Sequence, residues 1–502
     1  MKGDFTRFGI DARKHYSQVL HQQGRVTLDA DSNEASALLL RHLRALTRDL
    51  YGPAGGPPDG GFSLSLDTGA SPTALLVGPG HYYVDGVLCE NEDWVDYAQQ
   101  PDWTPAPPVN NEGGDSLLAW LRQPSPDQPF WLYLDVWERH VSWIEDDSIR
   151  EVALGGPDTC TRAQVVWQVK ALPWDREAWG DPNDNRDTCG TPMDSLPRLG
   201  TARMAAQLDP RAAYSDPCIV SPGAAYRGAE NHLYRVEVHR GGVAGAIGGA
   251  SFKWSRENGS VATRWLGTDP QGDAVALTVA SSRGFGAGDW VELSHDALEL
   301  SNEPGTLVRI ATVEGDHLVV DMASVPGGVL PAWSETLVHP RLRRWDQRSS
   351  DLVALDEGAV PVVESAGSPS TWLDLEDGIQ VAFEAGGRYR SGDYWLIPAR
   401  VATQGIEWPP RGTDGAWQPP LGIVHAYAPL GLLGVNADGT PALSRACRRC
   451  LSLAQVDCVV PEPPARDRVA LRPGQRRVAT APRQAVAAAG ATRHAKRRPK
   501  ER

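Results

Sequence analysis

Glycine and proline recur so often along this chain that its apolar runs stay short. The 502 residues include 51 glycines and 40 prolines, whereas average usage of the two together is about 12%. Turn residues at this frequency favour many short strands over long helices. No run approaches the roughly 18 consecutive apolar residues of a membrane-spanning helix. The pattern therefore predicts a mainly β protein, with hydrophobic residues at 41% sufficient for a real core.

The predicted strands group into a multi-domain body with β-sandwich or barrel-like parts. A cluster of short strands with polar turns predicts a small inserted barrel at residues 276–330. The β-rich body occupies residues 53–275 before it and residues 331–460 after it. Strand-like runs that support this division are Ala74–Leu88 (two strands about Gly78-Pro79-Gly80), Phe130–Trp143, Gln164–Leu172, His232–His239, Ala250–Trp254, Arg341–Asp346, Gly378–Phe383 and Tyr394–Ile397.

Residues 1–52 differ from the rest and form a predicted anchoring segment with a helix over about 32–50. Asp31 is placed to cap this helix, and Glu34 lies three residues later, as in a capping box. Leucines at three- and four-residue spacing give the helix one apolar stripe: Leu39, Leu43, Leu46 and Leu50. The stripe is compatible with docking on the chain's own body or on a neighbouring subunit, and the sequence leaves both open.

Charge is distributed unevenly. The formal net charge is −14, yet residues 466–502 hold 12 basic and two acidic side chains. An acidic body disfavours nucleic-acid binding because it repels phosphate. The basic stretch has no aromatic residue for stacking on bases, so we expect residues 461–502 to form a disordered tail. Residues 1–5 show no apolar secretion signal, which predicts synthesis and assembly in the cytoplasm without membrane insertion.

The seven cysteines are predicted to be reduced and mostly buried, because their number is odd and no secretion signal is visible. Cys447 and Cys450 have the spacing of a metal-binding pair. Only Cys458 follows as a further ligand, and arginines flank the pair. We therefore expect no metal site here.

Motifs of common enzymes are absent: there is no nucleophile elbow, zinc-protease helix motif, Walker loop or dinucleotide-binding glycine motif. Carboxylates near tryptophans, such as Asp135 and Glu138, leave a cell-wall glycoside hydrolase as a remote alternative. Strand alternation would place these two side chains on opposite faces. Aromatic faces leave a second alternative, a surface-glycan-binding module that uses Trp143, Trp290 or Trp395. We expect no catalytic residue and no cofactor.

Several long motifs resemble an uncharacterised bacterial family that is associated with phage-tail-like contractile injection systems. The resemblance covers most of residues 1 to about 450 and ends before about Pro461. Its motifs are Met1–Arg7, Lys14–Leu20, Gln22–Glu34, Tyr82–Gly86, Tyr226–His239, Phe252–Gly259 and Gly392–Arg400. Residues 23–34 also resemble, more loosely, the start of tailed-phage baseplate and tail-fibre proteins. The chain departs from the family at Ser32, where a tryptophan is expected.

The resemblance implies a structural part of the particle, baseplate or fibre-like, with no known enzyme activity. Its partners would be other particle proteins (baseplate, tube or fibre subunits), and it would leave the cell with the particle. The segment expected to dock on them contains Arg25, Asp29, Asp31, Asn33 and Glu34, together with Leu39, Leu43 and Leu46. Arg25 is suited to pair with partner carboxylates. An internal role for these residues, in turns and helix caps, remains the alternative.

Overall fold

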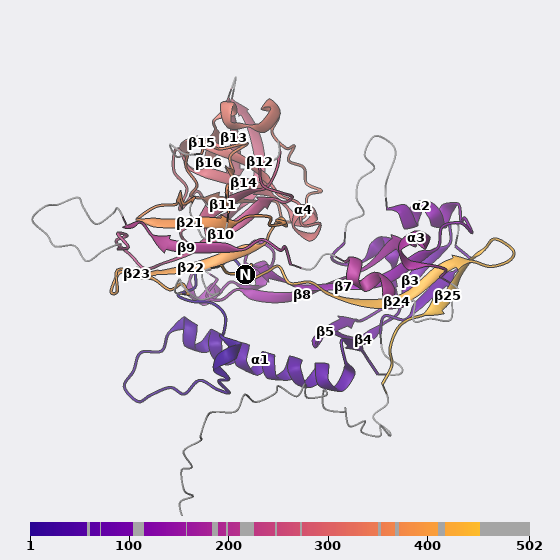
Figure 1. Cartoon of the computed structure of the whole chain (residues 1–502). Helices are drawn as coiled ribbons and strands as arrows, with labels where there is room; N and C mark the ends of the chain where they lie inside the picture. The colour runs from indigo at the N-terminus through magenta and orange to yellow at the C-terminus, as the bar shows by residue number, and fades with distance from the viewer. Residues whose placement is uncertain are drawn as a thin grey trace, which may run out of the picture. The chain divides into compact units, whose positions relative to one another are not determined.

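The computed structural model confirms a mainly β protein with several sheets, one barrel and an N-terminal helix (Figure 1). All the described residues belong to one compact unit, Met1–Ser452. The structure describes residues 1–57, 61–70, 72–103, 115–156, 158–182, 189–196, 199–210, 225–245, 248–271, 274–349, 353–366, 371–409 and 417–451. Residues 104–114, residues 183–188 and the expected disordered tail, residues 461–502, are among those that lie outside these ranges.

Among the residues that the structure describes, one helix is long. It is α1, Asp29–Tyr51, which begins and ends slightly beyond the predicted residues 32–50. The others are α2 (Ser116–Arg122), α3 (Arg176–Trp179) and α4 (Asp296–Leu300). Asp115 and Asp175 cap α2 and α3 by accepting hydrogen bonds from backbone N–H groups of the first turn. Within the described residues, none of these helices is long and apolar enough to cross a membrane.

Three sheets enclose the first hydrophobic core. One sheet has the order β1-β4-β5, the second β2-β3-β6, and the third β25-β24-β7-β8. Their bounds are β1 Ala54–Gly55, β2 Leu64–Asp67, β3 Ala74–Val77, β4 Gly80–Val84, β5 Val87–Asn91, β6 Val95–Asp96, β7 Phe130–Val141, β8 Arg162–Pro173, β24 Ala426–Val435 and β25 Pro441–Ala446. Phe62, Tyr82, Leu132 and Leu430 are among the buried side chains that fill the space between them.

The turn Gly78-Pro79-Gly80 separates two strands, as expected, but the two strands do not pair with each other. β3 pairs with β2 and β6, whereas β4 pairs with β5 and β1. The chain therefore passes from one sheet to another at these residues. The hairpin lies one strand later, where Asp85 and Gly86 both adopt positive φ, at 50° and 83°. Such a pair forms a tight turn between antiparallel strands.

Two further sheets enclose the second core in a sandwich-like arrangement. The first has the order β18-β11-β10-β22-β23, and the second has β19-β21-β20 with β9 also paired to β21. Tyr234, Trp254, Phe383 and Trp395 pack between these sheets. The bounds are β9 Met204–Leu208, β10 His232–Arg240, β11 Ser251–Ser255, β18 Val360–Pro361, β19 Glu364–Ser365, β20 Leu373–Asp374, β21 Ile379–Glu384, β22 Tyr394–Arg400 and β23 Gly405–Ile406.

The barrel is closed and larger than the sequence indicated. Its strand order is β12-β13-β16-β15-β14-β17. The bounds are β12 Ala262–Gln271, β13 Ala274–Val279, β14 Trp290–Ser294, β15 Thr306–Glu314, β16 His317–Val320 and β17 Arg341–Trp345. The barrel thus extends beyond residues 276–330 at both ends. The expectation that Arg341–Asp346 returns to the main body was wrong, because β17 pairs with both β12 and β14 and closes the barrel.

Candidate functional site

The first residues of the chain are part of the body. The ammonium of Lys2 lies 3.5 Å from a carboxylate oxygen of Glu237 on β10. The side-chain amide of Asn258 donates to the carbonyl of Gly3 at 2.9 Å, and Arg235 donates to the carbonyl of Met1 at 3.2 Å. Residues 1–3 are therefore anchored in the sheet β18-β11-β10-β22-β23, which we call the central sheet, and do not extend away from it.

The acidic residues that were expected to contact a partner organise the start of α1. Asp29 accepts a hydrogen bond from the backbone N–H of Thr6 at 2.8 Å. Asp31 accepts one from the N–H of Leu28, the N-cap residue, at 3.2 Å. The expected cap at Asp31 is thus wrong: Asp31 is the third helical residue and performs the reach-back assigned to Glu34. Because Thr6 fixes Asp29, the helix begins earlier than predicted.

The other polar residues of the expected docking segment have different surroundings. Glu34 forms an ion pair with Arg7 at 3.7 Å, within the chain. Asn33 lines a groove between α1 and residues 8–10. Arg25 is exposed and makes no ion pair with any residue in the described part of the chain. Asp29, Asp31 and Glu34 therefore contact residues of the same chain, as the internal alternative expects, whereas Arg25 is exposed.

The basic side of α1 faces the body. Arg44 pairs with Glu138 on β7 at 2.8 Å, and Arg48 pairs with Asp85 of the β4–β5 turn at 3.1 Å. The ring of Tyr51 stacks on that of Tyr83 with centroids 5.0 Å apart. In Figure 1, α1 runs beside β4 and β5. The helix is held to the body mainly by polar contacts and one aromatic stack.

The apolar side of α1 faces away from the body. Leu39, Leu43, Leu46 and Leu50 are each at least 50% exposed, whereas Leu38 is only 4% exposed. At about 100° per residue, these four leucines span an arc of about 60°, opposite Arg41 and Arg48. We call the four residues the leucine face. This amphipathicity is reversed, since a helix docked on its own core would bury its leucines and expose its arginines.

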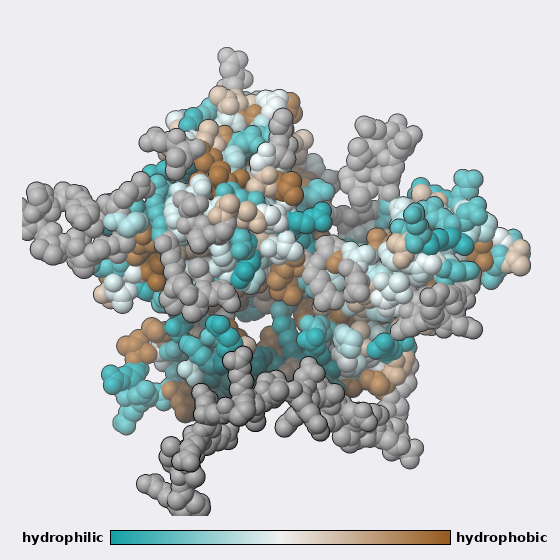
Figure 2. All heavy atoms as spheres, viewed as in Figure 1, coloured by the Kyte–Doolittle hydropathy of each residue, from teal (hydrophilic) through white to brown (hydrophobic). Residues whose placement is uncertain are grey.

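Residues 6–28, which lead into α1, expose further large apolar side chains. This segment contains only one short 3₁₀ turn, Ala12–Lys14. Figure 2 shows hydrophobic surface along the edge of the molecule where α1 and this segment lie in Figure 1. The exposed side chains are Phe8, Tyr16, Leu20, Val26 and Leu28. Exposed large apolar side chains are thus gathered on one segment of the chain.

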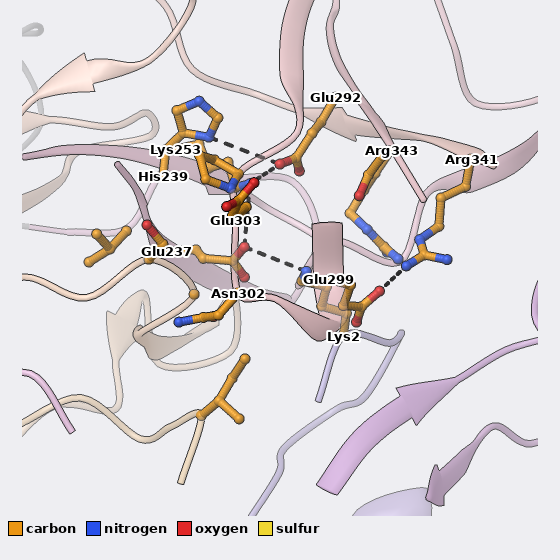
Figure 3. A pocket seen from close by; sticks show the side chains of 16 residues that line it. Lys2, Glu237, His239, Lys253, Glu292, Glu299, Asn302, Glu303, Arg341 and Arg343 are labelled. Carbon is orange, nitrogen blue, oxygen red and sulfur yellow. Dashed lines mark hydrogen bonds and ion pairs between the residues drawn. The ribbon is translucent and has the colours of Figure 1, made fainter. Parts of the chain in front are cut away.

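A second candidate site is a cavity of about 60 Å³ lined by charged side chains (Figure 3). Lys253 lies between two carboxylates there and forms ion pairs with Glu237, at 3.4 Å, and with Glu292. Burial opposes the ionisation of Glu292, but Lys253, His239 and Lys2 together outweigh it and lower the pKa of Glu292 to about 2. Burial lowers the pKa of His239 to about 3, so this imidazole is neutral at pH 7.

The lysine ammonium groups occupy the positions that a cation would need in this cavity. Lys253 and Lys2 both contact Glu237, and Arg341 forms an ion pair with Glu299 at the other side. In the described part of the chain, no group of three or more His, Cys, Asp or Glu residues is arranged to hold a metal ion. The cavity is therefore an ion-pair network that joins β10 and β11 to the barrel strands β14 and β17.

The carboxylates proposed for glycoside hydrolysis are not brought together. Asp135 is buried and accepts hydrogen bonds from His425 and Lys170, each at 2.7 Å. Glu138 pairs instead with Arg44 of α1. The two carboxylates lie on opposite faces of β7, as strand alternation predicts, so they cannot flank one glycosidic bond.

The three tryptophans expected to bind glycans have different surroundings. Trp395 is buried in the sandwich core, so its proposed role as an exposed binding face is wrong. Trp143 is covered by Arg150 and Arg264, whose guanidinium carbons lie 5.0 and 5.1 Å from the ring centroid. Trp290 lines an open groove of about 500 Å³ on the barrel and is the one of the three that a sugar could reach.

The cysteines are not all reduced. Cys189 and Cys447 form a disulfide, which corrects the prediction of free thiols and removes Cys447 from any metal site. Cys89 is buried as expected, but Cys160 and Cys450 are exposed. Cys458 lies outside the described residues. Sequence spacing gave no signal for the disulfide, because its two cysteines are 258 residues apart.

These features define a mainly β protein with exposed apolar side chains on its N-terminal segment and helix. The chain belongs to a family of unknown function, DUF6519, whose model matches residues 1–181 and 195–502. The match continues through residues 461–502, so the expectation that the tail lies outside the family was wrong. No curated protein and no solved structure matches the chain.

Proposed function

We propose that this protein is a non-enzymatic structural component, baseplate or fibre-like, of a phage-tail-like contractile injection apparatus. It docks on neighbouring baseplate, tube or fibre subunits through its N-terminal segment. The kind of assembly is suggested by the sequence motifs described above. The observation that carries the docking role is the reversed orientation of α1, which turns four leucines outward and pairs two arginines with the body.

The leucine face supplies the energetic reason for docking. Burial of a leucine side chain is worth about 1.5–3 kcal/mol relative to exposure. Four leucines that are at least half exposed forgo much of this stabilisation in the isolated chain. A partner that covered Leu39, Leu43, Leu46 and Leu50 would recover it. Arg44 and Arg48 are already paired within the chain, so the interface is chiefly apolar.

The test replaces leucines without disturbing the body. Deletion of residues 1–50 is unsuitable, because Lys2 and Gly3 contact the central sheet. We expect tagged wild-type protein to co-purify from its native host with sheath, tube and baseplate proteins, identified by mass spectrometry. The double variant Leu43→Glu/Leu46→Glu should lose these partners, whereas the control Leu266→Glu, an exposed leucine on the barrel strand β12, should keep them.

Two outcomes would contradict this proposal. One is normal co-purification of the double variant, provided that its thermal unfolding matches that of the wild type. The other is a wild-type protein that brings down none of the three classes of particle protein.

The disulfide adds a point about location. Disulfides persist in oxidising surroundings and are rare in the cytosol. The pair Cys189–Cys447 therefore fits a protein that is assembled in the cytoplasm and acts outside it after the particle is released.

A surface-glycan-binding role is the second candidate, and the groove at Trp290 favours it. Arg309, Arg348 and Gln347 share this groove. The side-chain oxygen of Gln347 is buried and has no hydrogen-bond partner among the described residues. An aromatic ring beside polar side chains suits a sugar. A glycan array should give reproducible hits that Trp290→Ala abolishes and Trp143→Ala retains; an array without hits removes this candidate.

A further inference from the structure

We propose that the leucine face of α1 pairs with the same face of a second copy of this chain, as a short antiparallel coiled coil. This inference rests on the proposed function in taking the leucine face as the docking surface, and it names the partner. Three observations support it: the spacing of the leucines, the charges beside them, and the pairing of the arginines with the body, away from the leucine face.

The spacing of the leucines selects a helix as the occupant. Leu39, Leu43, Leu46 and Leu50 follow one another at intervals of four, three and four residues. A mean interval of about 3.5 residues is the repeat with which two helices pack side chains into each other's gaps. A flat sheet surface imposes no such repeat. In heptad notation, Leu43 and Leu50 are at position a, and Leu39 and Leu46 are at position d.

The flanking residues select the antiparallel direction. His42 and Asp49 both occupy position g, and both are exposed. Antiparallel pairing brings g positions of the two helices together, so His42 lies beside Asp49 of the second copy, and this contact occurs twice by symmetry. Parallel pairing would instead place His42 beside Thr47 and leave Asp49 opposite a residue beyond the end of α1 at Tyr51. Only the antiparallel arrangement uses the charge on Asp49.

The arginines of α1 would oppose self-association if they bordered the seam. Arg44 and Arg48 are instead paired with Glu138 and Asp85 on the body, at 2.8 and 3.1 Å. Arg41 lines the groove between α1 and the body. Two copies can therefore approach through their leucine faces without bringing like charges together. In that arrangement Leu43 packs on Leu46 of the second copy.

The length of the seam sets the strength of the pairing. From Leu39 to Leu50 the helix rises by about 17 Å, which is less than two full heptads. Helical contacts this short are weak in isolation. We therefore expect a dimer that forms reversibly with concentration and that is reinforced where many copies are held in one particle.

The first experiment measures the mass of the full chain by analytical ultracentrifugation over about two decades of concentration. The expected result is a monomer–dimer equilibrium for the wild type and for Leu266→Glu, and a monomer at all concentrations for Leu43→Glu. A wild-type monomer throughout overturns self-pairing. If Leu43→Glu nevertheless loses the particle proteins in the pull-down, the docking role stands and only the identity of the partner is wrong.

The second experiment tests direction by cysteine cross-linking. Cys160 and Cys450, the exposed free thiols, are first replaced by serine. Oxidation of a mixture of Leu43→Cys and Leu46→Cys proteins should then join position 43 of one chain to position 46 of the other, as identified by peptide mass spectrometry. Leu43→Cys alone should cross-link little. An efficient link between two copies of position 43 would show a parallel pair and overturn the proposal.

Discussion

Asp393 is a buried carboxyl group whose ionisation opposes folding. Its Oδ2 atom accepts a hydrogen bond from the N–H of Gly200 at 2.8 Å, but its Oδ1 atom has no hydrogen-bond partner among the described residues. Burial raises the pKa of Asp393 from 3.8 to about 7. Between these values the folded carboxyl keeps its proton while the unfolded one has lost it. Its contribution to stability therefore falls as the pH rises from about 4 to about 7.

The variant Asp393→Asn should remove this pH dependence. The amide can still accept from Gly200 and never ionises. We expect the variant to be more stable than the wild type at pH 8, by about 1 kcal/mol or more, and to differ little at pH 4. Thermal unfolding at the two pH values measures the effect. An identical difference at both would show that the carboxyl does not titrate as argued.

Glu292 is the carboxylate whose loss should cost most stability in the charged cavity. It pairs with Lys253 and also accepts hydrogen bonds from the indole N–H of Trp345, at 2.9 Å, and the N–H of Gly305, at 3.0 Å. Glu292→Gln leaves the buried ammonium of Lys253 less compensated, so we expect a loss of about 3–5 kcal/mol at pH 7. The exposed Glu303, at the edge of the same cavity, provides the control Glu303→Gln, with little expected change.

The Glu292 effect has a defined pH dependence. Because its folded pKa of about 2 is below the usual value of 4.5, its stabilisation is present above about pH 4.5 and is lost as the pH falls toward 2. The difference between wild type and Glu292→Gln in urea unfolding should therefore shrink over that window. A difference that stays constant would point to a loss of packing and not of charge.

At the level of elements, α1 packs against the β4–β5 turn at Gly86. A Cβ atom added to Gly86 would lie 2.4 Å from the backbone carbonyl oxygen of Arg44, and the φ of Gly86 is +83°. Both the turn and the helix would have to move to accept a side chain. We expect Gly86→Ala to loosen α1 from the body, and amide hydrogen exchange to become faster across residues 29–51.

The matched control for this change is Gly315→Ala. Gly315 also has positive φ, at 61°, and also lies in a hairpin turn, but a Cβ there meets no atom within 4 Å. The backbone strain in Gly315→Ala should be similar to that in Gly86→Ala. A difference between the two variants therefore reports the contact with the helix and not the strain. Equal rates of amide hydrogen exchange across α1 in the two variants would argue against this contact between α1 and Gly86.

Strands and their faces could be predicted from the sequence where alternation is clear. β7 and β8 follow their expected runs closely, and the opposite faces of Asp135 and Glu138 follow from the period of two. The pairing of strands could not be predicted in the same way. β17 was misplaced because Arg341 and Arg343 look like surface residues, yet buried carboxylates neutralise Arg341 inside the molecule.

The candidate site could likewise be predicted from the sequence only in part. The leucine stripe of α1 was visible in the sequence, but its outward orientation was not, because that depends on Glu138 and Asp85 reaching the arginines. The charged cavity was missed entirely. Lys2, Glu237, Lys253 and Glu292 come from three separate parts of the chain and have no common spacing. Their proximity is a consequence of how the barrel meets the central sheet.

At the scale of the whole molecule, the disulfide Cys189–Cys447 joins two distant segments. The carbonyl of Cys189 accepts a hydrogen bond from the indole of Trp131 at 3.2 Å, and the N–H of Cys447 donates to Leu430 at 2.9 Å. The bond thus ties residues 189–196 to the sheet that contains β7 and β24. It closes a loop of 258 residues, and native disulfides with long loops contribute about 2–5 kcal/mol.

Removal of this disulfide should lower the melting temperature of the full chain. We expect Cys189→Ser/Cys447→Ser to unfold several degrees below the wild type, and wild-type protein treated with a reductant to match it. Cys160→Ser removes an exposed free thiol and should leave the melting temperature unchanged, with or without reductant. If reductant lowers the stability of the double variant as well, its action is not through this bond. If the double variant melts with the wild type, the two segments are held by their hydrogen bonds and packing alone, and the argument for an oxidising destination loses its support.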